Sequence, residues 1–433
     1  MPHHCTMAFT LAKGARSIRP FSHFTAAEQF LYWKHMESKA RLQPRLIVQG
    51  PPRPQKLYPR GYHPENSAWA STEGNQRSQG NLLPGSILKI VSWNLEWSAP
   101  DPARRATAAL DHLQQRFGAA PGPLVVMLQE VCLESLRALL ENPWLQRNFN
   151  LTETTPPQSI YDDVCGDSFV LKDLYWRATS YFTLMMLPKS LRILDCFRVP
   201  FVSDMGRDAL CVDIPISAGR RSTSDRSIRL CTTHLESLYG SENHRSSQLA
   251  TISRLIKETR AKDHNIIAGL VGGDMNAITP PDHDLHRANE VDLRDAWEDI
   301  PAPSIPVLKP FQKDMSFGKA RGNTWGYQSK AARTRKRLDK FYYTGHLETV
   351  PLSEPQDVTG KIGRIGIGCK TVVEARQVEE RSKVFVRGKL VEKTSIKYYK
   401  RRLDGLTPDA PCVKIDHWVS DHFGIAVGIK VRE

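Results

Sequence analysis

Five short polar motifs, each next to an apolar stretch typical of a buried strand, constrain the fold of this chain most. They span more than 300 residues and are, in chain order, SWNLEW (92–97), MLQEV (127–131), THLES (233–237), GGDMN (272–276) and SDHFG (420–424). Functional side chains of α/β proteins lie preferentially at strand ends, where the sheet holds them rigidly. The motifs together therefore predict one site at the ends of successive strands in two packed sheets.

Each motif taken singly also has an ordinary explanation. A lone glutamate at a strand end, such as Glu130, is most often a solvated charge at the rim of a sheet. The GGDMN motif is common turn chemistry, because Gly and Asx residues tolerate positive φ. His234 alone could be a half-buried strand histidine, and His422 alone could belong to an ordinary loop. The functional interpretation depends on all five motifs occurring in this order.

Hydrophobic periodicity between the motifs predicts alternating strands and helices. The expected strands are 87–94, 124–130, 181–187, 207–216, 228–234 and 265–273, with a closing pair near 338–344 and 423–431, and the expected helices are about 102–117, 133–141 and 242–260. A polar hairpin turn is expected around 221–224. Strands and helices alternating in this way indicate an α/β fold.

The residue types in the motifs suit hydrolysis of a phosphate ester with a divalent metal ion. Such a reaction brings a water onto phosphorus while negative charge grows on the phosphoryl and leaving oxygens, and a hard cation such as Mg²⁺ neutralises that charge. Glu130, at the end of an apolar run, is the first expected metal ligand. Asp274 and Asn276 are two positions apart, so the carboxylate could activate the water while the amide supports a phosphoryl oxygen.

Two histidines and a further carboxylate complete the predicted site. We expect His234 and His422 to donate as imidazolium groups to the developing oxyanion. Asp339, within RLDKF, is the natural carboxylate to orient His422 through its other ring nitrogen. Neither a G-x-S-x-G motif nor a Walker loop is present, which disfavours a serine nucleophile and P-loop chemistry.

Composition bears on the cellular setting. No run of 18 apolar residues occurs, so no membrane span is predicted. The eight cysteines are scattered without a C-x-x-C pair, as expected of small core residues in a reducing compartment. We expect a nuclear and/or cytoplasmic monomer, although Lys13, Arg16 and Arg19 among Ser, Thr and Ala also resemble a mitochondrial presequence.

The net charge of +14 is unevenly distributed. Residues 1–85 hold 11 Lys/Arg against 4 Asp/Glu, and residues 330–403 hold 19 against 8. Breakers in the first segment predict a flexible basic N-terminal arm with a short helix around 26–39. Residues 86–433 would form the catalytic domain, with a basic insertion at about 361–402. Both segments favour nucleic acid through counterion release, but a solvated tail and a solvated surface hairpin remain open as alternatives.

Over about residues 86–433 the motifs resemble the endonuclease/exonuclease/phosphatase superfamily. The resemblance implies a DNase I-like four-layer α/β sandwich, in which two mixed sheets pack face to face with helices outside. Three longer stretches (181–187, 200–212 and 233–249) are similar to the tyrosyl-DNA phosphodiesterase 2 family within it. That similarity implies a DNA-repair enzyme that removes tyrosine from DNA 5′ phosphates left by trapped topoisomerase 2, acting on 5′ ends and single-stranded overhangs.

Carried over position by position, the resemblance also implies a role for each site residue. Glu130 and Asp421 would hold Mg²⁺, with Mn²⁺ as an alternative, and Asp274 would activate the water. The groups implied around the phosphate are Asn94, Asn276, His234 and His422.

Three further side chains are implied in substrate binding. Arg207 and Trp325 would pair by a cation–π contact, and Tyr181 and Trp325 would stack on the displaced 5′ nucleotides. The chain departs from the family at Leu338, where an aromatic residue is common, so the resemblance implies no stacking contact from this position.

Two other functions remain open at this stage. The first is another phosphoesterase of the superfamily: an abasic-site endonuclease, a deadenylase, an inositol phosphatase or a sphingomyelinase. All would share the metal site, because substrate choice depends on loops. The second is a catalytically idle scaffold that binds nucleic acid through its basic segments.

Overall fold

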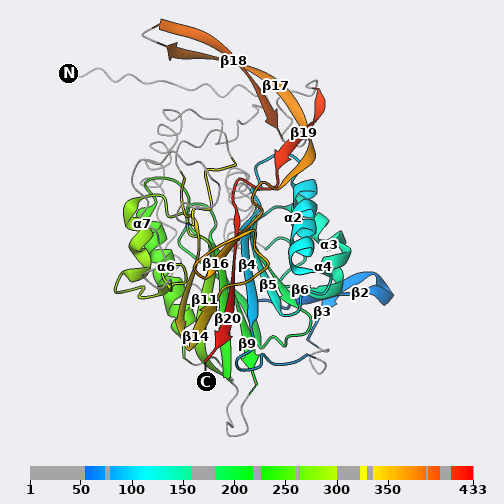
Figure 1. The fold of residues 1–433 in the computed structure, drawn as a ribbon, viewed down its shortest axis with the longest axis vertical. Coiled ribbons are helices and arrows are strands. Elements are labelled where there is room, and N and C mark those ends of the chain that lie inside the picture. The colour runs from blue at the N-terminus through cyan, green and yellow to red at the C-terminus, as the bar shows by residue number, and fades with distance from the viewer. Residues whose placement is uncertain are drawn as a thin grey trace, which may run out of the picture. The chain divides into compact units, whose positions relative to one another are not determined.

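The computed structural model in Figure 1 describes residues 54–73, 79–157, 181–217, 226–259, 261, 264–299, 322–328, 335–386, 389–399 and 411–432. Its contacts divide the chain into two compact units. One comprises Pro52–Val373 with Lys414–Glu433, and the other comprises Met1–Pro51 with Glu374–Val413. All five motifs lie in the first unit, so this unit contains the predicted site.

The first unit contains a sheet of ten strands within the described residues, in the order β15-β16-β20-β4-β5-β7-β6-β2-β3, with β14 also paired to β20. Its central strands are β20 (Gly424–Val431), β4 (Leu88–Asn94), β5 (Leu124–Val131) and β7 (Phe182–Pro188). Its outer strands are β15 (Asp357–Thr359), β16 (Ile362–Ile365), β14 (Leu347–Val350), β6 (Phe149–Leu151), β2 (Arg60–His63) and β3 (Ala68–Ser71).

A second sheet of the same unit has seven strands within the described residues, in the order β1-β8-β9-β10-β11-β13-β12. Its central strands are β9 (Asp208–Ile216), β10 (Arg226–His234), β11 (Asn265–Asp274) and β13 (Asp339–Gly345). The others are β1 (Gln55–Lys56), β8 (Asp195–Pro200) and β12 (Arg294–Asp295).

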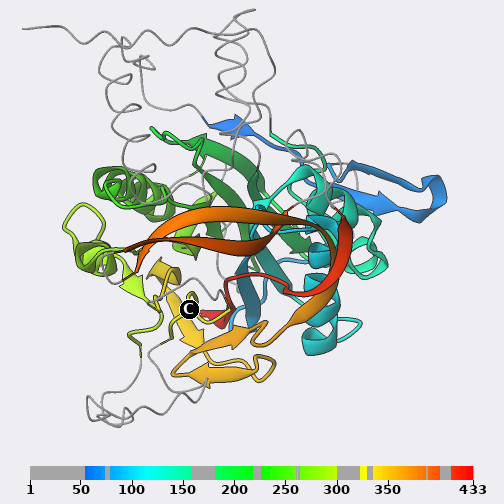
Figure 2. The same cartoon turned by 90° about the horizontal axis from the view of Figure 1, so that it is seen from above.

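Helices cover the outer faces of both sheets, as Figure 2 shows from above. Beside the ten-stranded sheet lie α2 (Pro102–Phe117), α3 (Leu133–Glu141) and α4 (Pro143–Asn148). Beside the seven-stranded sheet lie α6 (Glu242–Lys257) and α7 (Pro280–Asp284). In the described residues, no helix is both long and apolar enough to cross a bilayer.

Alternation along the strands explains why the layers form. In β5, Val125 and Met127 belong to the core between the sheets, whereas Val126 and Leu128 pack with α2 and α3. A strand with apolar residues on both faces is buried on both faces. The same division holds in β9 and β11 on the other sheet, whose outer face packs against α6. The architecture is therefore the predicted four-layer α/β sandwich.

The N-terminal boundary predicted from sequence is wrong. Residues 1–53, including the expected helix at 26–39, lie outside the described residues, but the segment after them is part of the core unit. β1 pairs with β8, and β2 pairs with both β3 and β6. Breaker residues surround these very short strands, and the pairing of β1 with β8 and of β2 with β6 joins residues distant in the chain, so hydrophobic periodicity did not reveal them.

The predicted basic insertion at 361–402 begins too early. β16 belongs to the ten-stranded sheet, where it pairs with β20. The hairpin that follows is formed by β17 (Lys370–Val386) and β18 (Lys389–Tyr399), and a three-stranded sheet has the order β18-β17-β19, with β19 spanning Cys412–Trp418. The expected polar turn at 221–224 lies outside the described residues.

Candidate active site

Strand directions bring the motifs together at one edge of the two sheets. β4 and β5 are parallel, so Asn94 and Glu130 lie at neighbouring ends. β10 and β11 are also parallel, and His234 is opposite Asp274 in the register. β13 runs antiparallel to β11 and begins with Asp339 opposite Asp274. Since β20 runs antiparallel to β4, the residues just before its start meet the end of β4.

The glycines of GGDMN belong to strand β11 rather than to a turn, and close packing requires them. A Cβ on Gly273 would lie 2.0 Å from the carbonyl oxygen of Thr233, and one on Gly272 would lie 2.5 Å from the ring of Phe341. The two glycines therefore allow β11 to approach both neighbouring strands. This approach places Asp274 beside His234.

Asn94 joins the two sheets at the centre of the site. Its side-chain nitrogen donates to Glu130 Oε1 at 3.0 Å and to Asp274 Oδ2 at 3.1 Å. Its backbone carbonyl accepts a hydrogen bond from the hydroxyl of Ser420, 326 residues later, at 2.6 Å. Residues from four of the five motifs are therefore directly linked through one buried asparagine.

Glu130 lies at a β-bulge in β5, where the pairing with β7 shifts between Leu128 and Val131. Its φ of 57° is unusual for a residue other than glycine and is a form of strain found at functional sites. The second carboxylate oxygen accepts the N–H of Trp97 at 2.9 Å. Burial, and next the charge of Asp421, raise the pKa of Glu130. A carboxylate so placed is stabilised in its charged form by a cation.

Asp274 is buried, and one of its oxygens accepts the backbone N–H of Asn276 at 2.9 Å. Burial raises its pKa to about 6, with protonated His422 opposing this shift and Asp339 adding to it. Asn276 donates through its side chain to Leu235 O at 2.8 Å and to Ser237 Oγ at 3.1 Å. Asp274 is therefore a carboxylate whose basicity exceeds that of an exposed aspartate.

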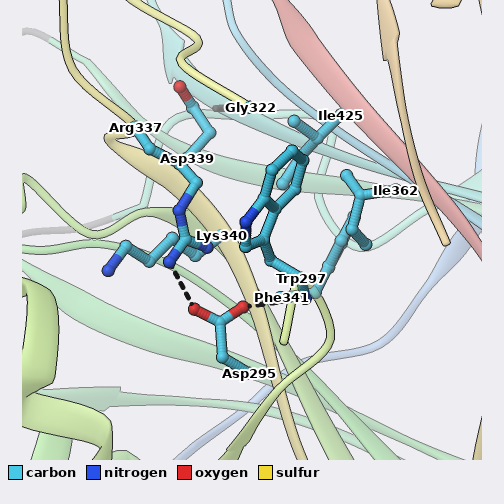
Figure 3. Close-up of a pocket in the computed structure, with 9 residues that line it drawn as sticks. All are labelled: Asp295, Trp297, Gly322, Arg337, Asp339, Lys340, Phe341, Ile362 and Ile425. Atoms are coloured by element: carbon cyan, nitrogen blue, oxygen red, sulfur yellow. Dashed lines mark hydrogen bonds and ion pairs between the residues drawn. The ribbon is translucent and has the colours of Figure 1, made fainter. Parts of the chain in front are cut away.

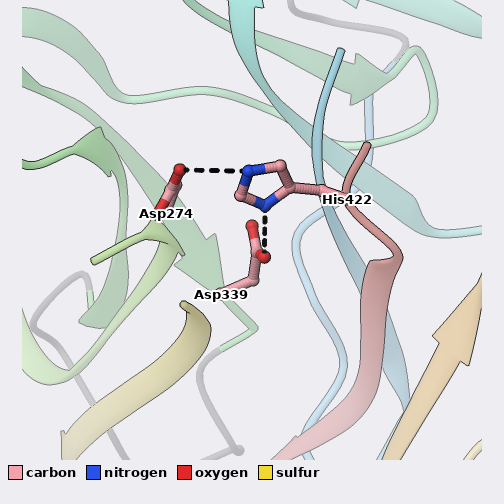
Figure 4. Close-up of side chains that lie close together, drawn as sticks. All are labelled: Asp274, Asp339 and His422. Atoms are coloured by element: carbon pink, nitrogen blue, oxygen red, sulfur yellow. Dashed lines mark hydrogen bonds and ion pairs between the residues drawn. The ribbon is translucent and has the colours of Figure 1, made fainter. Parts of the chain in front are cut away.

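His422 lies between two carboxylates, as Figure 4 shows. Its Nδ1 is 2.8 Å from Asp339 Oδ2, and its Nε2 is 3.7 Å from Asp274 Oδ2. Burial opposes the charged ring, but Asp339, Asp421 and Asp274 outweigh it and raise the pKa of His422 well above its usual value. The predicted orientation of His422 by Asp339 is what the structure shows, and the ring is a charged donor.

His234 differs from the prediction that it would be an imidazolium. Arg207 Nη1 lies 2.9 Å from its Nδ1, and its Nε2 is 3.4 Å from Asp274 Oδ2. Burial, the charge of Arg207 and then that of His422 lower the pKa of His234 well below its usual value. His234 is therefore neutral, because a guanidinium occupies the position where a carboxylate would be needed to hold a charged ring.

The cation–π pairing implied for Arg207 and Trp325 is also corrected. The Arg207 guanidinium lies over the ring of Tyr181, 5.0 Å from its centroid, and no such contact with Trp325 is present between these described residues. Tyr181 also stacks on Trp97, with ring centroids 5.1 Å apart. Trp325 is half-buried and donates its indole N–H to Asp421 Oδ2 at 2.8 Å. Trp325 is thus tied to the predicted metal ligand rather than to Arg207.

Glu96 belongs to the site although sequence reasoning overlooked it. It has a positive φ of 52°, and its backbone N–H donates to Asn94 Oδ1 at 2.9 Å. Burial, followed by the charges of Asp421 and Glu130, raises the pKa of Glu96 to about 8, while Arg105 opposes this shift. Its position inside the first motif, two residues after Asn94, was the signal that could have identified it.

The carboxylates fit a hard divalent ion. Besides burial, the charge of Asp421 raises the pKa of both Glu96 and Glu130, and Glu96 Oε2 is a buried oxygen without a hydrogen-bond partner among the described residues. Carboxylate oxygens without sulfur ligands suit Mg²⁺ or Mn²⁺. Glu130 and Asp421, the predicted ligands, and Glu96 thus offer oxygens of the type that such an ion binds.

A second cluster of titratable side chains lies near the small pocket shown in Figure 3. Unlike the carboxylates of the candidate site, its carboxylates are paired with arginines. Asp295 accepts Arg337 Nη2 at 2.7 Å, and Glu298 pairs with His286 at 3.2 Å and with Arg287 at 2.8 Å. Because two arginines already neutralise these carboxylates, the group is an ion-pair network rather than a cation site.

Comparisons with known proteins identify the family. Similar solved structures include truncated Caenorhabditis elegans TDP2 (15% identity, covering 80% of this chain and 99% of that chain, TM-score 0.47). D. rerio TDP2 complexed with single strand DNA product is 17% identical, covering 80% and 100%, with a TM-score of 0.44. The human Nocturnin catalytic domain with bound sulfate anion is 15% identical, covering 81% and 96%, with a TM-score of 0.41. A search of curated protein sequences gave no match.

The family model for the Endonuclease/Exonuclease/phosphatase family matches residues 91–422, which include every residue of the site from Asn94 to His422. This chain therefore belongs to the endonuclease/exonuclease/phosphatase family and is a hydrolase that acts on phosphate esters.

Proposed function

We propose that this protein is a Mg²⁺-dependent phosphodiesterase that removes tyrosine from the 5′ phosphate of DNA. The observation that supports the phosphodiester chemistry is the arrangement around Asp274. This buried carboxylate lies next to a protonated His422 and a neutral His234 and shares the Asn94 amide with Glu130. A base, two ring N–H donors and a metal-binding carboxylate thus converge on one point.

Each group then has a role in the reaction. When bound at Glu130 and Asp421, the metal ion neutralises charge on the phosphoryl oxygens. Asp274 accepts a proton from the attacking water, whose oxygen bonds to phosphorus as the bond to the tyrosyl oxygen breaks. His422 can offer its Nε2–H to the developing negative charge, because Asp339 holds its other ring nitrogen. Preorganised donors of this kind usually supply the largest part of the rate enhancement.

The preference for DNA ends rests on aromatic side chains beside the site. Tyr181 and Trp97 stack on one another next to His234, whose ring centroid lies 6.0 Å from that of Tyr181. Trp325 donates its indole N–H to Asp421, one of the two predicted metal ligands. Flat rings of this kind bind single-stranded nucleotides irrespective of sequence. The D. rerio TDP2 structure carries a single-strand DNA product, and we extend that substrate class to this chain.

A substrate panel tests the proposal. The purified protein is assayed with a 5′-phosphotyrosyl oligonucleotide, an abasic duplex, poly(A) and a phosphoinositide, each with Mg²⁺, with Mn²⁺ and with a chelator. We expect metal-dependent release of tyrosine to exceed turnover of the other substrates. Asp274→Asn serves as the control for contaminating nucleases. Faster turnover of another substrate would reassign the chain within the family, and turnover unaffected by the chelator would contradict the metal site.

A further inference from the structure

The loop that joins β8 to β9 is fastened to the site through one serine. Phe201 N–H donates to Arg207 O at 3.0 Å and closes this loop. Within it, Ser203 Oγ accepts the backbone N–H of Met205 at 3.0 Å and that of Arg207 at 2.9 Å. The same hydroxyl donates to Glu236 Oε2 at 2.6 Å. Ser203 therefore fixes the backbone that carries Arg207 relative to the end of β10.

Glu236 is fully buried and is held by neutral donors. Besides Ser203, it accepts the backbone N–H of Asp204 at 3.1 Å and the side-chain amide of Gln248 at 2.9 Å. Among the described residues no Lys, Arg or His nitrogen pairs with this carboxylate. A buried carboxylate without a cation is costly unless hydrogen bonds satisfy it. These bonds make the loop conformation and the buried Glu236 depend on one another.

The loop places the guanidinium of Arg207 against the ring of His234. Arg207 donates through Nη1 to His234 Nδ1 at 2.9 Å and through Nη2 to Ser237 Oγ at 2.9 Å. A guanidinium only donates and does not lose its charge in proteins, so Nδ1 must be the acceptor. The ring proton then resides on Nε2, the nitrogen that faces Asp274.

We propose that Glu236 and Ser203 are positioning residues that hold Arg207 so that it fixes His234 as the Nε2–H tautomer facing Asp274. The tautomer matters because the Nδ1–H form would present an acceptor, rather than a donor, towards the reacting phosphate. The catalytic consequence rests on the proposed function, but the tautomer itself does not. Neither Glu236 nor Ser203 contacts Asp274, so both act through Arg207.

Nitrogen-15 NMR of histidine-labelled protein tests the tautomer directly. His234→Gln identifies the two ring resonances. We expect the wild-type spectrum to show a protonated Nε2 and an unprotonated Nδ1, and Ser203→Ala and Glu236→Gln to shift both resonances towards a mixture of tautomers. Ser203→Thr keeps the hydroxyl and should restore the wild-type pattern. Ser86→Ala and Glu290→Gln, which change a hydroxyl and an exposed carboxylate outside this hydrogen-bond network, are matched controls.

Kinetics on a 5′-phosphotyrosyl oligonucleotide measure the effect on the reaction. Since misplacement of a catalytic group by about 1 Å can cost on the order of 100-fold, we expect Ser203→Ala to lower kcat by roughly 10- to 100-fold with little change in KM. Melting curves recorded alongside separate this effect from unfolding. A wild-type His234 with its proton on Nδ1, or a spectrum unchanged in a folded Ser203→Ala, would overturn the proposal. An inactive wild type with the expected spectrum would instead overturn the proposed function.

Discussion

At the scale of single residues, the site assigns opposite charge states to two histidines that lie close to the same carboxylate. Asp339 lies at Nδ1 of His422. The charges of the nearby carboxylates outweigh the effect of burial, so the pKa of His422 is raised. Arg207 lies at Nδ1 of His234. Burial and the positive charge of Arg207 both disfavour a protonated ring, so the pKa of His234 is lowered. The sequence placed both rings in the site but could not show this difference. It depends on which side chain a loop places behind each ring.

Glu130→Gln should abolish hydrolysis while leaving the fold intact. Glutamine keeps the volume and can still bond Trp97 N–H, but it removes the charge that would neutralise the metal ion. The measurement is turnover at millimolar Mg²⁺ together with a melting curve, with Glu242→Gln as the matched control on the surface of α6. Wild-type turnover in the variant would show that Glu130 is not the metal ligand.

Trp325→Ala should cost about 1–3 kcal/mol on a 5′-phosphotyrosyl oligonucleotide, the range for one lost base stack. It should cost little on a minimal aryl phosphodiester, which has no bases. Trp325→Phe is the matched control, because it keeps a ring but loses the N–H bond to Asp421. If Trp325 instead serves mainly in packing, truncation would lower stability by about 3–5 kcal/mol and reduce activity on both substrates equally.

At the scale of secondary structure, the elements with strong periodicity were predictable. The bounds of α2 and α3 match the predicted helices, and β4, β5, β9, β10 and β11 lie within two residues of the predicted strands. β8 was missed because Arg198 interrupts its apolar pattern. The structure accommodates this buried arginine by pairing it with Asp208 at 2.9 Å and with Glu153. Both partners lie outside β8, and Glu153 precedes Arg198 by 45 residues, so periodicity alone cannot reveal the strand.

Most of the site was predictable because its residues lie at the ends of strands that were themselves predicted. Parallel strands place their carboxyl ends together, so motifs at strand ends identify Asn94, Glu130, His234 and Asp274 as neighbours. The roles of Glu236 and Arg207 were not predictable in the same way. They depend on the conformation of the loop between β8 and β9, and one of those strands had been missed.

The hairpin of β17 and β18 is expected to contribute to DNA binding. Its strands pair from Arg376 opposite Tyr399 to Val386 opposite Lys389. Replacing Lys397 of β18, together with Lys400, Arg401 and Arg402, which follow β18 in the sequence and lie outside the described residues, by glutamine should weaken DNA affinity and flatten its dependence on salt, by up to about one unit of slope per lost phosphate contact. Binding is measured at several salt concentrations, with turnover of a minimal aryl phosphodiester as the internal reference. If the slope is unaltered, these basic residues do not contact DNA phosphates and form an ordinary solvated surface.

At the scale of the whole molecule, two deletions should distinguish the part of the N-terminal segment that supports the core from the part that does not. Removing residues 1–53 should leave stability and activity on a short oligonucleotide nearly unchanged, since no motif lies there. Removing residues 1–80 also deletes β1, β2 and β3 and the packing of Trp69 on the core, so it should cost about 1–3 kcal/mol of stability. Melting curves of both proteins check this, and equal stability would show that these strands do not support the core.

Stability should also depend on pH through Lys340. Burial, followed by the charge of Arg337, lowers the pKa of Lys340 to about 7. In the unfolded chain lysine keeps its usual higher pKa, so between pH 7 and about 10 the unfolded state binds more protons and folding stability rises with pH. Lys340→Met should flatten this rise. Lys414→Met, which replaces an exposed lysine, should leave it unchanged. An unchanged dependence on pH in Lys340→Met would contradict the assignment.

The hydrogen bond from Ser420 to the carbonyl of Asn94 has a consequence for how the enzyme is made. The first motif is held in place by the last, 326 residues further along the chain. A chain still growing on the ribosome can therefore present the strands that carry Asn94, Glu130, His234 and Asp274 while lacking Ser420, Asp421 and His422 altogether. Such a nascent chain holds an incomplete reaction centre, so hydrolytic activity emerges only after the motif that contains Ser420, Asp421 and His422 has been synthesised.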